Sequence, residues 1–269
     1  MTEKLKVSYI NDLHLDNWIH FNHNEHKYKK NVAEFVNKLC EEAPTVKDLL
    51  IVSGDISHFN RVTYWVLNQF SLYYNKVIFV GGNHDYYLIS KSQNRKYKGK
   101  SVNRAIELAN MFKDHPKVEV LGSFSDKCFT EYKGFKIGGL TMTSKQITEE
   151  GISLYRGFMN DKRYIPESTD FLNDVDMQHY NELKSKKLDI FISHYPLVTT
   201  YTHRMYSTDG SVESYKCVVD ELIAEHNFFG HVHESNQMYD MVETKHHTNA
   251  YGYPHEPLER NIQQVEIIK

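Results

Sequence analysis

Polar clusters that contain carboxylate, amide and imidazole groups follow apolar runs at three places in the first third of the chain. They read NDLHLD from Asn11, SGDISH from Ser53 and GGNHD from Gly81. Each preceding run is short, apolar and rich in branched residues, so each cluster is predicted to lie at a strand end. Side chains of these types bind divalent metals and transfer protons, and open α/β sheets collect such groups at the carboxyl ends of their strands.

Two later clusters supply further imidazoles. His194 follows the apolar run LDIFIS, and the stretch HNFFGHVHE contains His231 and His233. In an extended segment, residues two apart lie on the same side, so His231 and His233 are predicted to point to one place, as are Asp12 and His14. The spacing therefore predicts a metal site assembled from distant segments.

The donor set predicts more than one metal ion. Oxygens from Asp12, Asp55 and Asn83, together with four imidazoles, exceed the needs of one tetrahedral ion. They suit two divalent ions joined by a carboxylate, which at about 3.5 to 4 Å apart would clamp the attacking and departing oxygens of phosphoryl transfer. Manganese, iron, zinc, cobalt and nickel all accept such mixed oxygen and nitrogen ligands, so the metal stays open.

The elements that must position these clusters alternate at first between strand and helix. Apolar strands are predicted at Lys6–Ile10, Leu49–Ser53 and Val77–Val80. Residues with helical periodicity occupy Tyr28–Glu42 and Arg61–Tyr74 between them. This alternation is typical of parallel strands joined by helices.

The second half of the chain reads differently. Cys128–Met142 is predicted to form a hairpin that turns at Lys133 and Gly134, and residues 236–253 and 261–269 read as strands without intervening helices. More antiparallel sheet is therefore expected there. No repeat and no long Gly/Ser linker interrupts the chain, so residues 1–269 are predicted to form one domain of mixed α/β class.

Composition indicates which partners and which cellular compartment to expect for the protein. The formal net charge of -3 gives no overall attraction to nucleic acid or to an anionic membrane. Cys40, Cys128 and Cys217 are isolated, which argues against both a disulfide framework and a thiolate zinc site. No apolar run approaches the ~18 residues of a membrane span, and the chain begins without a long apolar leader. A cytoplasmic protein with no membrane partner is the expectation.

Five motifs together carry a family resemblance. They are DLH at Asp12–His14, GD at Gly54–Asp55, GNHD at Gly82–Asp85, the lone His194 and GHVH at Gly230–His233. In their order and coverage of the chain they resemble the signature of the calcineurin-like metallophosphoesterases. The resemblance implies a four-layer sandwich, in which two mixed β-sheets are flanked by helices and a binuclear metal site lies at the strand ends.

The resemblance also implies roles for individual residues, carried over by position. The first metal would be held by four of them: Asp12, His14, Asp55 and His233. The second would share Asp55 and take three more ligands: Asn83, His194 and His231. A hydroxide that bridges the metals would attack phosphorus. His84 would act as the catalytic acid beside the departing oxygen, and Asp85 would orient it.

Three further stretches resemble a bacterial and phage-type branch of these phosphohydrolases whose substrates are mostly unassigned. They read IGGLTMTS from Ile137, FMNDKRYI from Phe158 and TNAYGYPHE from Thr248. The protein serine/threonine phosphatases of the superfamily continue their GD motif with Val-Asp-Arg-Gly, whereas this chain reads GDISHFN. That departure disfavours a phosphoprotein substrate.

The expected function is therefore a metal-dependent phosphoesterase that hydrolyses a phosphomonoester or a phosphodiester, with a small molecule or nucleotide as partner. A nuclease acting on nucleic acid is an alternative within the same chemistry. The alternative from another class is a catalytically silent scaffold that binds metal and other proteins. A silent scaffold has no need of a complete ligand set, so the intact set favours the enzyme.

Three other stretches leave their roles open. Lys91–Arg104 is basic and contains no acid, which indicates a mobile solvated loop or a lid that guides phosphates. Asn160, Asp161 and Arg163 read either as a solvated turn or as substrate contacts. His20–His26 reads as an exposed polar loop.

Overall fold

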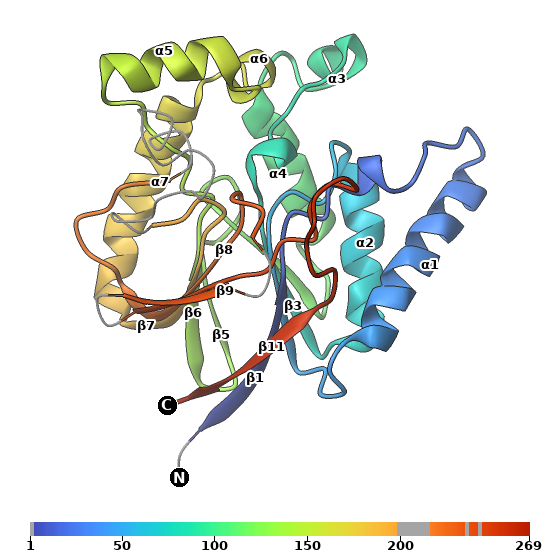
Figure 1. Cartoon of the computed structure of the whole chain (residues 1–269), viewed down its shortest axis with the longest axis vertical. Helices are drawn as coiled ribbons and strands as arrows, with labels where there is room; N and C mark the ends of the chain where they lie inside the picture. Colours follow the sequence, from blue (N-terminus) through green and yellow to red (C-terminus); the bar gives the residue numbers. More distant parts are fainter. Residues whose placement is uncertain (1–2, 198–215, 235–236, 242–243) are drawn as a thin grey trace.

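Two β-sheets pack face to face in this protein, with helices on both outer sides (Figure 1). The structure is a computed structural model and describes residues 3–197, 216–234, 237–241 and 244–269. Within these ranges one sheet has five strands and the other has six. Helix, sheet, sheet and helix form the four layers that the motifs imply, so the predicted fold class is confirmed.

The first sheet is mostly parallel. Its strands, in spatial order, are β11 (Gln263–Ile268), β1 (Lys4–Ile10), β2 (Leu49–Ser53), β3 (Lys76–Val80) and β4 (Val118–Leu121). β1 to β4 run parallel to one another, and β11 pairs antiparallel with β1. The three strands predicted before the first polar clusters are confirmed, as is their parallel pairing.

Three helices cover the outer face of this sheet: α1 (Glu25–Glu42), α2 (Asn60–Tyr73) and α4 (Ser101–Met111). Their apolar stripes pack on one face of the strands, where Val36 and Phe70 share a core with Val52 and Phe79. The two helices predicted from periodicity are therefore confirmed to within a few residues. None of the helices in the described ranges is long and apolar enough to cross a bilayer.

The second sheet is mixed. Its strands, in spatial order, are β5 (Phe129–Tyr132), β6 (Phe135–Gly139), β7 (Leu188–Ile192), β8 (Ala224–Phe229), β10 (Thr244–Thr248) and β9 (Gln237–Met241). β5 and β6 form the predicted hairpin, which turns at Lys133 and Gly134, both with positive φ. The centre of the sheet is parallel, a feature that the sequence does not predict. It arises because helix α7 (Thr169–Leu183) separates β6 from β7 and because β9 turns back on β10.

The space between the sheets is filled by alternate strand residues. Val7 and Ile51 of the first sheet meet Ile137 and Ile190 of the second in one buried cluster. On the far side of the second sheet, Tyr180 of α7 packs in a separate core. Because both faces of the central strands are covered, these strands read as unbroken apolar runs rather than as alternating ones.

Three buried histidines on neighbouring strands make the fold sensitive to acid. Burial lowers the pKa of His226 on β8 and of His246 on β10 to about 4, and that of His247 to about 3. The unfolded chain binds protons at these side chains near the ordinary value of about 6.5, so the unfolded state gains protons first as the pH falls. Stability is therefore expected to fall between about pH 6.5 and pH 4, by about 1–2 kcal/mol for each histidine at pH 5.

Urea unfolding at pH 7 and pH 5, with a chelator present, measures this loss. The variant His226→Gln/His247→Gln should lose less stability on acidification than the wild type. The matched control is His20→Gln/His23→Gln, because both of those side chains are exposed, as predicted. Equal losses in the wild type and in both variants would show that the buried pair does not carry the effect.

Candidate metal centre

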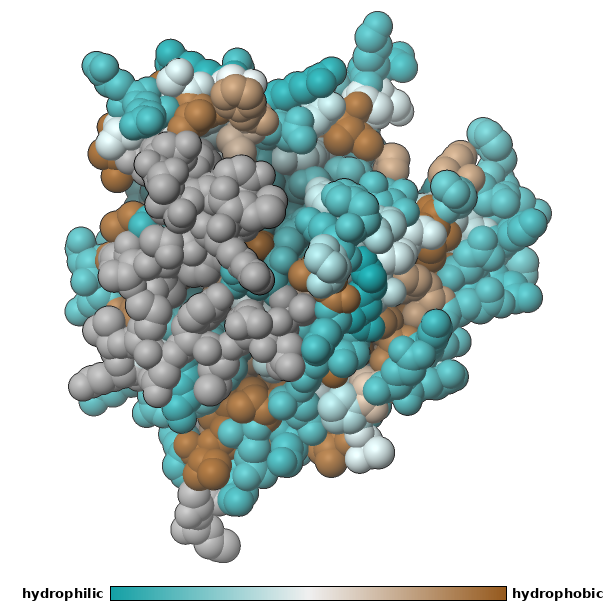
Figure 2. Space-filling model, in the orientation of Figure 1, coloured by the Kyte–Doolittle hydropathy of each residue, from teal (hydrophilic) through white to brown (hydrophobic). Residues whose placement is uncertain are grey.

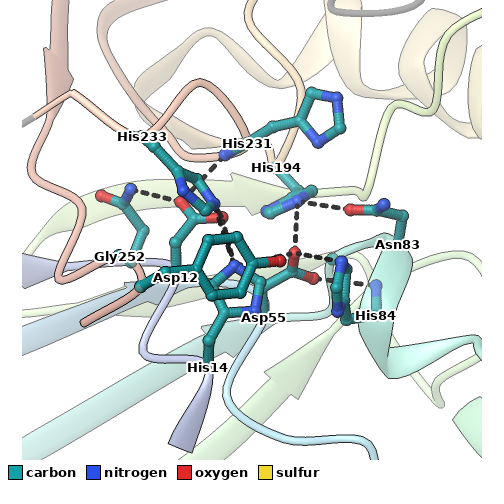
Figure 3. A network of polar contacts seen from close by, with 12 residues as sticks. Asp12, His14, Asp55, Asn83, His84, His194, His231, His233 and Gly252 are labelled. Carbon is teal, nitrogen blue, oxygen red and sulfur yellow. Dashed lines mark hydrogen bonds and ion pairs between the residues drawn. The ribbon is translucent and has the colours of Figure 1, made fainter. Parts of the chain in front are cut away.

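The ends of five parallel strands bring the predicted residues to one place (Figure 3). The first sheet supplies five of them, in the loops after β1, β2 and β3: Asp12, His14, Asp55, Asn83 and His84. The second sheet supplies three, in the segments after β7 and β8: His194, His231 and His233. The site therefore lies where the carboxyl ends of the two sheets meet, as open α/β folds favour.

One group of side chains gathers around Asp12. His14 Nε2 and His233 Nε2 lie 2.9 Å apart, and they are 3.7 Å and 3.5 Å from Asp12 Oδ1. Within the described residues, Asp12 Oδ1 is buried and has no hydrogen-bond partner. A buried carboxylate oxygen is costly without a partner, and two imidazole nitrogens face it here. A divalent cation would satisfy all three atoms, so this donor set fits a metal.

A second group gathers around Asp55. Asp55 Oδ2 lies 3.4 Å from His194 Nε2 and 3.9 Å from His84 Nε2, while His194 Nε2 is 3.0 Å from Asn83 Oδ1. Asp55 Oδ2 is also 3.8 Å from His14 Nε2 in the first group. Asp55 therefore lies between the two groups, where a carboxylate shared by two ions would be needed.

His231 differs from the other predicted ligands. Its backbone N–H donates to Asp12 Oδ2 over 2.9 Å, but its ring stacks on Tyr195 and points away from the two carboxylates in Figure 3. Its ring nevertheless lies 5.2 Å from the ring of His194. A change of rotamer would be required to bring its nitrogen into the second group.

The backbone of these loops is unusual. Five of the predicted ligands have positive φ: Asp12, His14, Asp55, His231 and His233, with values from 42° to 71°. This conformation is uncommon for residues other than glycine, and such strain clusters at functional sites. The loops are also too close for an extra carbon: a Cβ at Gly82 would lie 2.2 Å from Asp55 Oδ1.

His84 is held by a chain of polar groups that the motifs do not predict. His58 Nε2 lies 2.9 Å from His84 Nδ1, and His58 Nδ1 lies 3.1 Å from Asp16 Oδ2. With Nδ1 engaged in this way, His84 presents Nε2 to the metal centre. Burial lowers the pKa of His84. A sign of this partnership exists in the sequence, since His58 follows Asp55 by three residues.

The hydrogen bonds of Asp85 in the described part of the chain go to backbone N–H groups rather than to the His84 ring, whereas the resemblance implies that it orients this ring. Its Oδ2 accepts hydrogen bonds of 2.9 Å from the backbone N–H groups of Asp55 and Gly82. Burial, followed by the charge of Asp55, raises the pKa of Asp85 to about 6. Asp85 therefore ties together the loops after β2 and β3, and His58 takes the place beside His84.

Asp161 is buried, which excludes the solvated turn, one of the two alternatives that the sequence leaves open for this residue. It lies in the short helix α6 (Asp161–Tyr164) and accepts hydrogen bonds from Asn83 Nδ2 at 2.7 Å and from the hydroxyls of Tyr87 and Tyr195. Because the amide nitrogen of Asn83 donates to Asp161, its amide oxygen faces His194. Asp161 thus orients a candidate ligand.

Glu256 orients His233, another candidate ligand. Its two carboxylate oxygens lie 2.8 Å and 2.9 Å from His233 Nδ1, which leaves Nε2 directed at Asp12. Burial opposes protonation of this ring, but the nearby carboxylates of Asp12 and Glu256 raise the pKa of His233 to about 10. Glu256 lies in the stretch from Thr248 that carries the narrower resemblance, yet its sequence context gives no direct sign of this contact.

Glu256→Gln is expected to weaken metal binding about 10- to 100-fold, because a carboxylate that accepts from a ligand histidine fixes its orientation and raises its basicity. Metal titration of the stripped protein measures the loss. Glu259→Gln serves as the control, since Glu259 lies nearby in sequence but outside the centre. Equal affinities for the two variants would contradict the orienting role.

Arg104 links the loops of the metal centre through hydrogen bonds of its guanidinium group. It is fully buried and donates from Nε to Asn60 Oδ1, from Nη1 to the carbonyls of His84 and Tyr87, and from Nη2 to the carbonyl of Ser57, over 2.8–3.0 Å. The expectation of a mobile loop over residues 91–104 is wrong. Its residues form α3 (Lys91–Lys96), which the Ser90 side chain caps, and the first turn of α4.

Arg104→Met is expected to lower the free energy of unfolding by about 3–5 kcal/mol, because it leaves several buried oxygens without donors. Urea unfolding measures the change, with Arg95→Met on the exposed side of α3 as a matched control. A loss no larger than that of the control would show that the hydrogen bonds of Arg104 contribute little to the free energy of unfolding.

The metal centre opens into a cleft of about 380 Å³. Its floor includes Asp55 and His84, and one wall is formed by Phe158 and Met159 at the end of α5 (Glu149–Phe158). Phe158 is 81% exposed, so an apolar ring stands at the mouth of an otherwise polar cleft. The cleft can therefore admit a small molecule from the solvent.

The chain resembles known proteins in both sequence and structure. The model of the calcineurin-like phosphoesterase family matches residues 5–235. A phosphopantetheinyl hydrolase from Mycobacterium tuberculosis has a similar structure, with a TM-score of 0.69, 18% sequence identity, and coverage of 97% of this chain and 95% of the other. A protein of unknown function from Aquifex aeolicus gives a TM-score of 0.31 at 15% identity, with coverage of 79% and 88%. No curated protein matches the sequence.

Proposed function

Because the chain belongs to the calcineurin-like phosphoesterase family, we propose that it hydrolyses a phosphomonoester or phosphodiester at a centre that holds two divalent metal ions. The observation that carries the proposal is the position of Asp55 between two groups of ligand atoms. Asp55 Oδ2 lies 3.8 Å from His14 Nε2 of the first group and 3.4 Å from His194 Nε2 of the second group.

The proposed ligands of the first ion are Asp12, His14, Asp55 and His233, and those of the second are Asp55, Asn83, His194 and His231. Carboxylate, amide and imidazole donors suit manganese as well as iron, zinc, cobalt or nickel. When bound, the ions supply positive charge to the phosphoryl oxygens and lower the pKa of a water molecule that can attack phosphorus.

The protein itself contributes orientation and proton transfer. Asp161 and Glu256 hold two of the proposed ligands in place, as the contacts to Asn83 and His233 support. We assign His84 the role of acid: its Nε2 faces the cleft, and His58 secures its other nitrogen. A histidine in this position can donate a proton to the departing oxygen of the substrate.

The silent scaffold is the weaker alternative. The centre contains a buried carboxylate oxygen without a partner and five residues in left-handed conformation, features that cost stability and are retained where function needs them. A nuclease shares the same chemistry, and only the choice of substrate separates it from an esterase of small molecules. Free Cys40, Cys128 and Cys217 are consistent with the expected cytoplasmic location.

A substrate screen tests the proposal. The purified protein, stripped and then reloaded with each candidate metal in turn, is assayed against phosphomonoesters, phosphodiesters, nucleotides and short oligonucleotides. A phosphopantetheine ester belongs in the panel, since the structurally similar mycobacterial protein is a phosphopantetheinyl hydrolase. Metal-dependent release of phosphate or alcohol is expected. Full metal loading without hydrolysis of any substrate would favour the scaffold.

A further inference from the structure

A second hollow, of about 710 Å³, lies beside the metal cleft. Its walls come from residues 88–91, from Asn94 and Arg95 of α3, and from Arg163 and Tyr164 of α6. α3 and α6 stand next to each other at the top of the molecule in Figure 1, with hydrophilic surface between them in Figure 2. This hollow has the size of a pocket for a small molecule, which spans about 300–1,000 Å³.

The hollow carries only positive charge. Lys91, Arg95 and Arg163 are its ionisable residues apart from Tyr164, and its lining contains no carboxylate. Among the described residues, none of the three cations forms an ion pair, although the chain as a whole is net negative. Arg163 rests on the ring of Tyr164, 5.2 Å from its centroid, so one of the three charges is partly fixed in place. Such a concentration of unpaired positive charge attracts anions.

The hollow and the metal cleft share a wall. Asp161 at the start of α6 lines the cleft, whereas Arg163 and Tyr164 of the same helix line the hollow. The Tyr164 ring lies 5.3 Å from the Tyr87 ring, which in turn stacks on His84 at 4.4 Å. A molecule bound at His84 is therefore separated from the cationic hollow by one turn of α6.

We propose that this hollow binds a second anionic group of the substrate, so that the enzyme acts on small phosphoesters that carry a further phosphate several bonds away from the reacting one, as nucleoside 3′,5′-bisphosphates do. The inference rests on the proposed function, because the metal cleft must receive the reacting phosphate. A polynucleotide would require a basic stripe along which its backbone could run, whereas these three cations line one hollow. The observations favour the small molecule.

Binding without catalysis provides the first test. Inorganic tripolyphosphate is titrated calorimetrically into the chelator-treated protein, its Arg95→Glu/Arg163→Glu variant and the control Lys27→Glu/Lys29→Glu. The control changes the net charge by the same amount on the exposed face of α1, which is hydrophilic in Figure 2. The affinity should fall about 10- to 100-fold in the first variant and stay unchanged in the control, as expected for the loss of charge-assisted contacts. No binding, or an equal loss in both variants, would overturn the proposal.

Kinetics of the metal-loaded enzyme provide the second test. The ratio of KM for adenosine 3′,5′-bisphosphate to KM for p-nitrophenyl phosphate should rise about 10- to 100-fold in the Arg95→Glu/Arg163→Glu variant and stay constant in the control. A constant ratio in both would overturn the inference, as would a greater loss for oligonucleotides than for adenosine 3′,5′-bisphosphate. If the wild type hydrolyses no ester, the proposed function fails, and the calorimetric result still decides the fate of the anion site.

Discussion

Replacing Asp55 by asparagine is expected to reduce phosphoesterase activity at least about 1,000-fold, and to lower the metal content of the protein. Asp55 Oδ2 lies 3.8 Å from His14 Nε2 and 3.4 Å from His194 Nε2, so this one oxygen is within reach of both groups of ligand atoms. Asparagine keeps the shape of the side chain but removes the negative charge that would balance two cations. Both ions should therefore bind more weakly.

Elemental analysis and the turnover number of the same samples measure the two effects. Asp174→Asn is the control, because Asp174 is exposed on α7 and pairs with Lys145. Circular dichroism shows whether each variant keeps its fold. An Asp55→Asn protein with both metals and a near-normal rate would remove the shared carboxylate from the proposal.

Replacing His84 by alanine is expected to slow hydrolysis of alkyl or ribose esters by about 100- to 10,000-fold, the range typical of general acid catalysis. The same change should affect a p-nitrophenyl ester far less, because nitrophenolate departs without protonation. Burial lowers the pKa of His84, so its proton is readily donated once it is bound. The metal content should stay near normal, since His84 is assigned to proton transfer rather than to metal binding.

Turnover numbers for two esters with the same acid part and different leaving groups separate these roles. His58→Gln should reproduce the effect in weaker form, about tenfold, because it disturbs only the contact to His84 Nδ1. His179→Ala on α7 is the control, since His179 lies outside the cleft. Equal losses on both esters would exclude the acid role, and loss of one metal would make His84 a ligand.

The strand ends of the centre could be predicted because each combines a buried apolar run with a short polar motif. The residues that orient the candidate ligands could not be predicted. Asn83 and its partner Asp161 are 78 residues apart, and His233 is 23 residues from Glu256. Whether such a carboxylate lies in solvent or against a ligand depends on how the loops pack, and no local pattern records it.

For the segment from Lys91, the sequence predicts a solvated loop where the structure has helices. It contains few apolar residues and no acid, so its composition suggests a solvated loop, yet the Ser90 cap and the packing of α4 make it helical. Arg104 looks like one more surface cation in the sequence. Its burial becomes intelligible only when the carbonyls of Ser57, His84 and Tyr87 are seen to surround its guanidinium.

The pairing of β1 with β11 sets an order of events during synthesis on the ribosome. Lys4 lies beside Ile268, so one edge of β1 stays uncovered in the nascent chain until residues 263–268 have been synthesised. Asp12, just after β1, also waits for a segment that is made much later, because its carbonyl accepts a hydrogen bond from the N–H of Gly252. Contacts between residues so distant in sequence form slowly. An uncovered apolar strand edge is prone to aggregation, and the nascent chain is therefore expected to depend on chaperones until β11 emerges and docks.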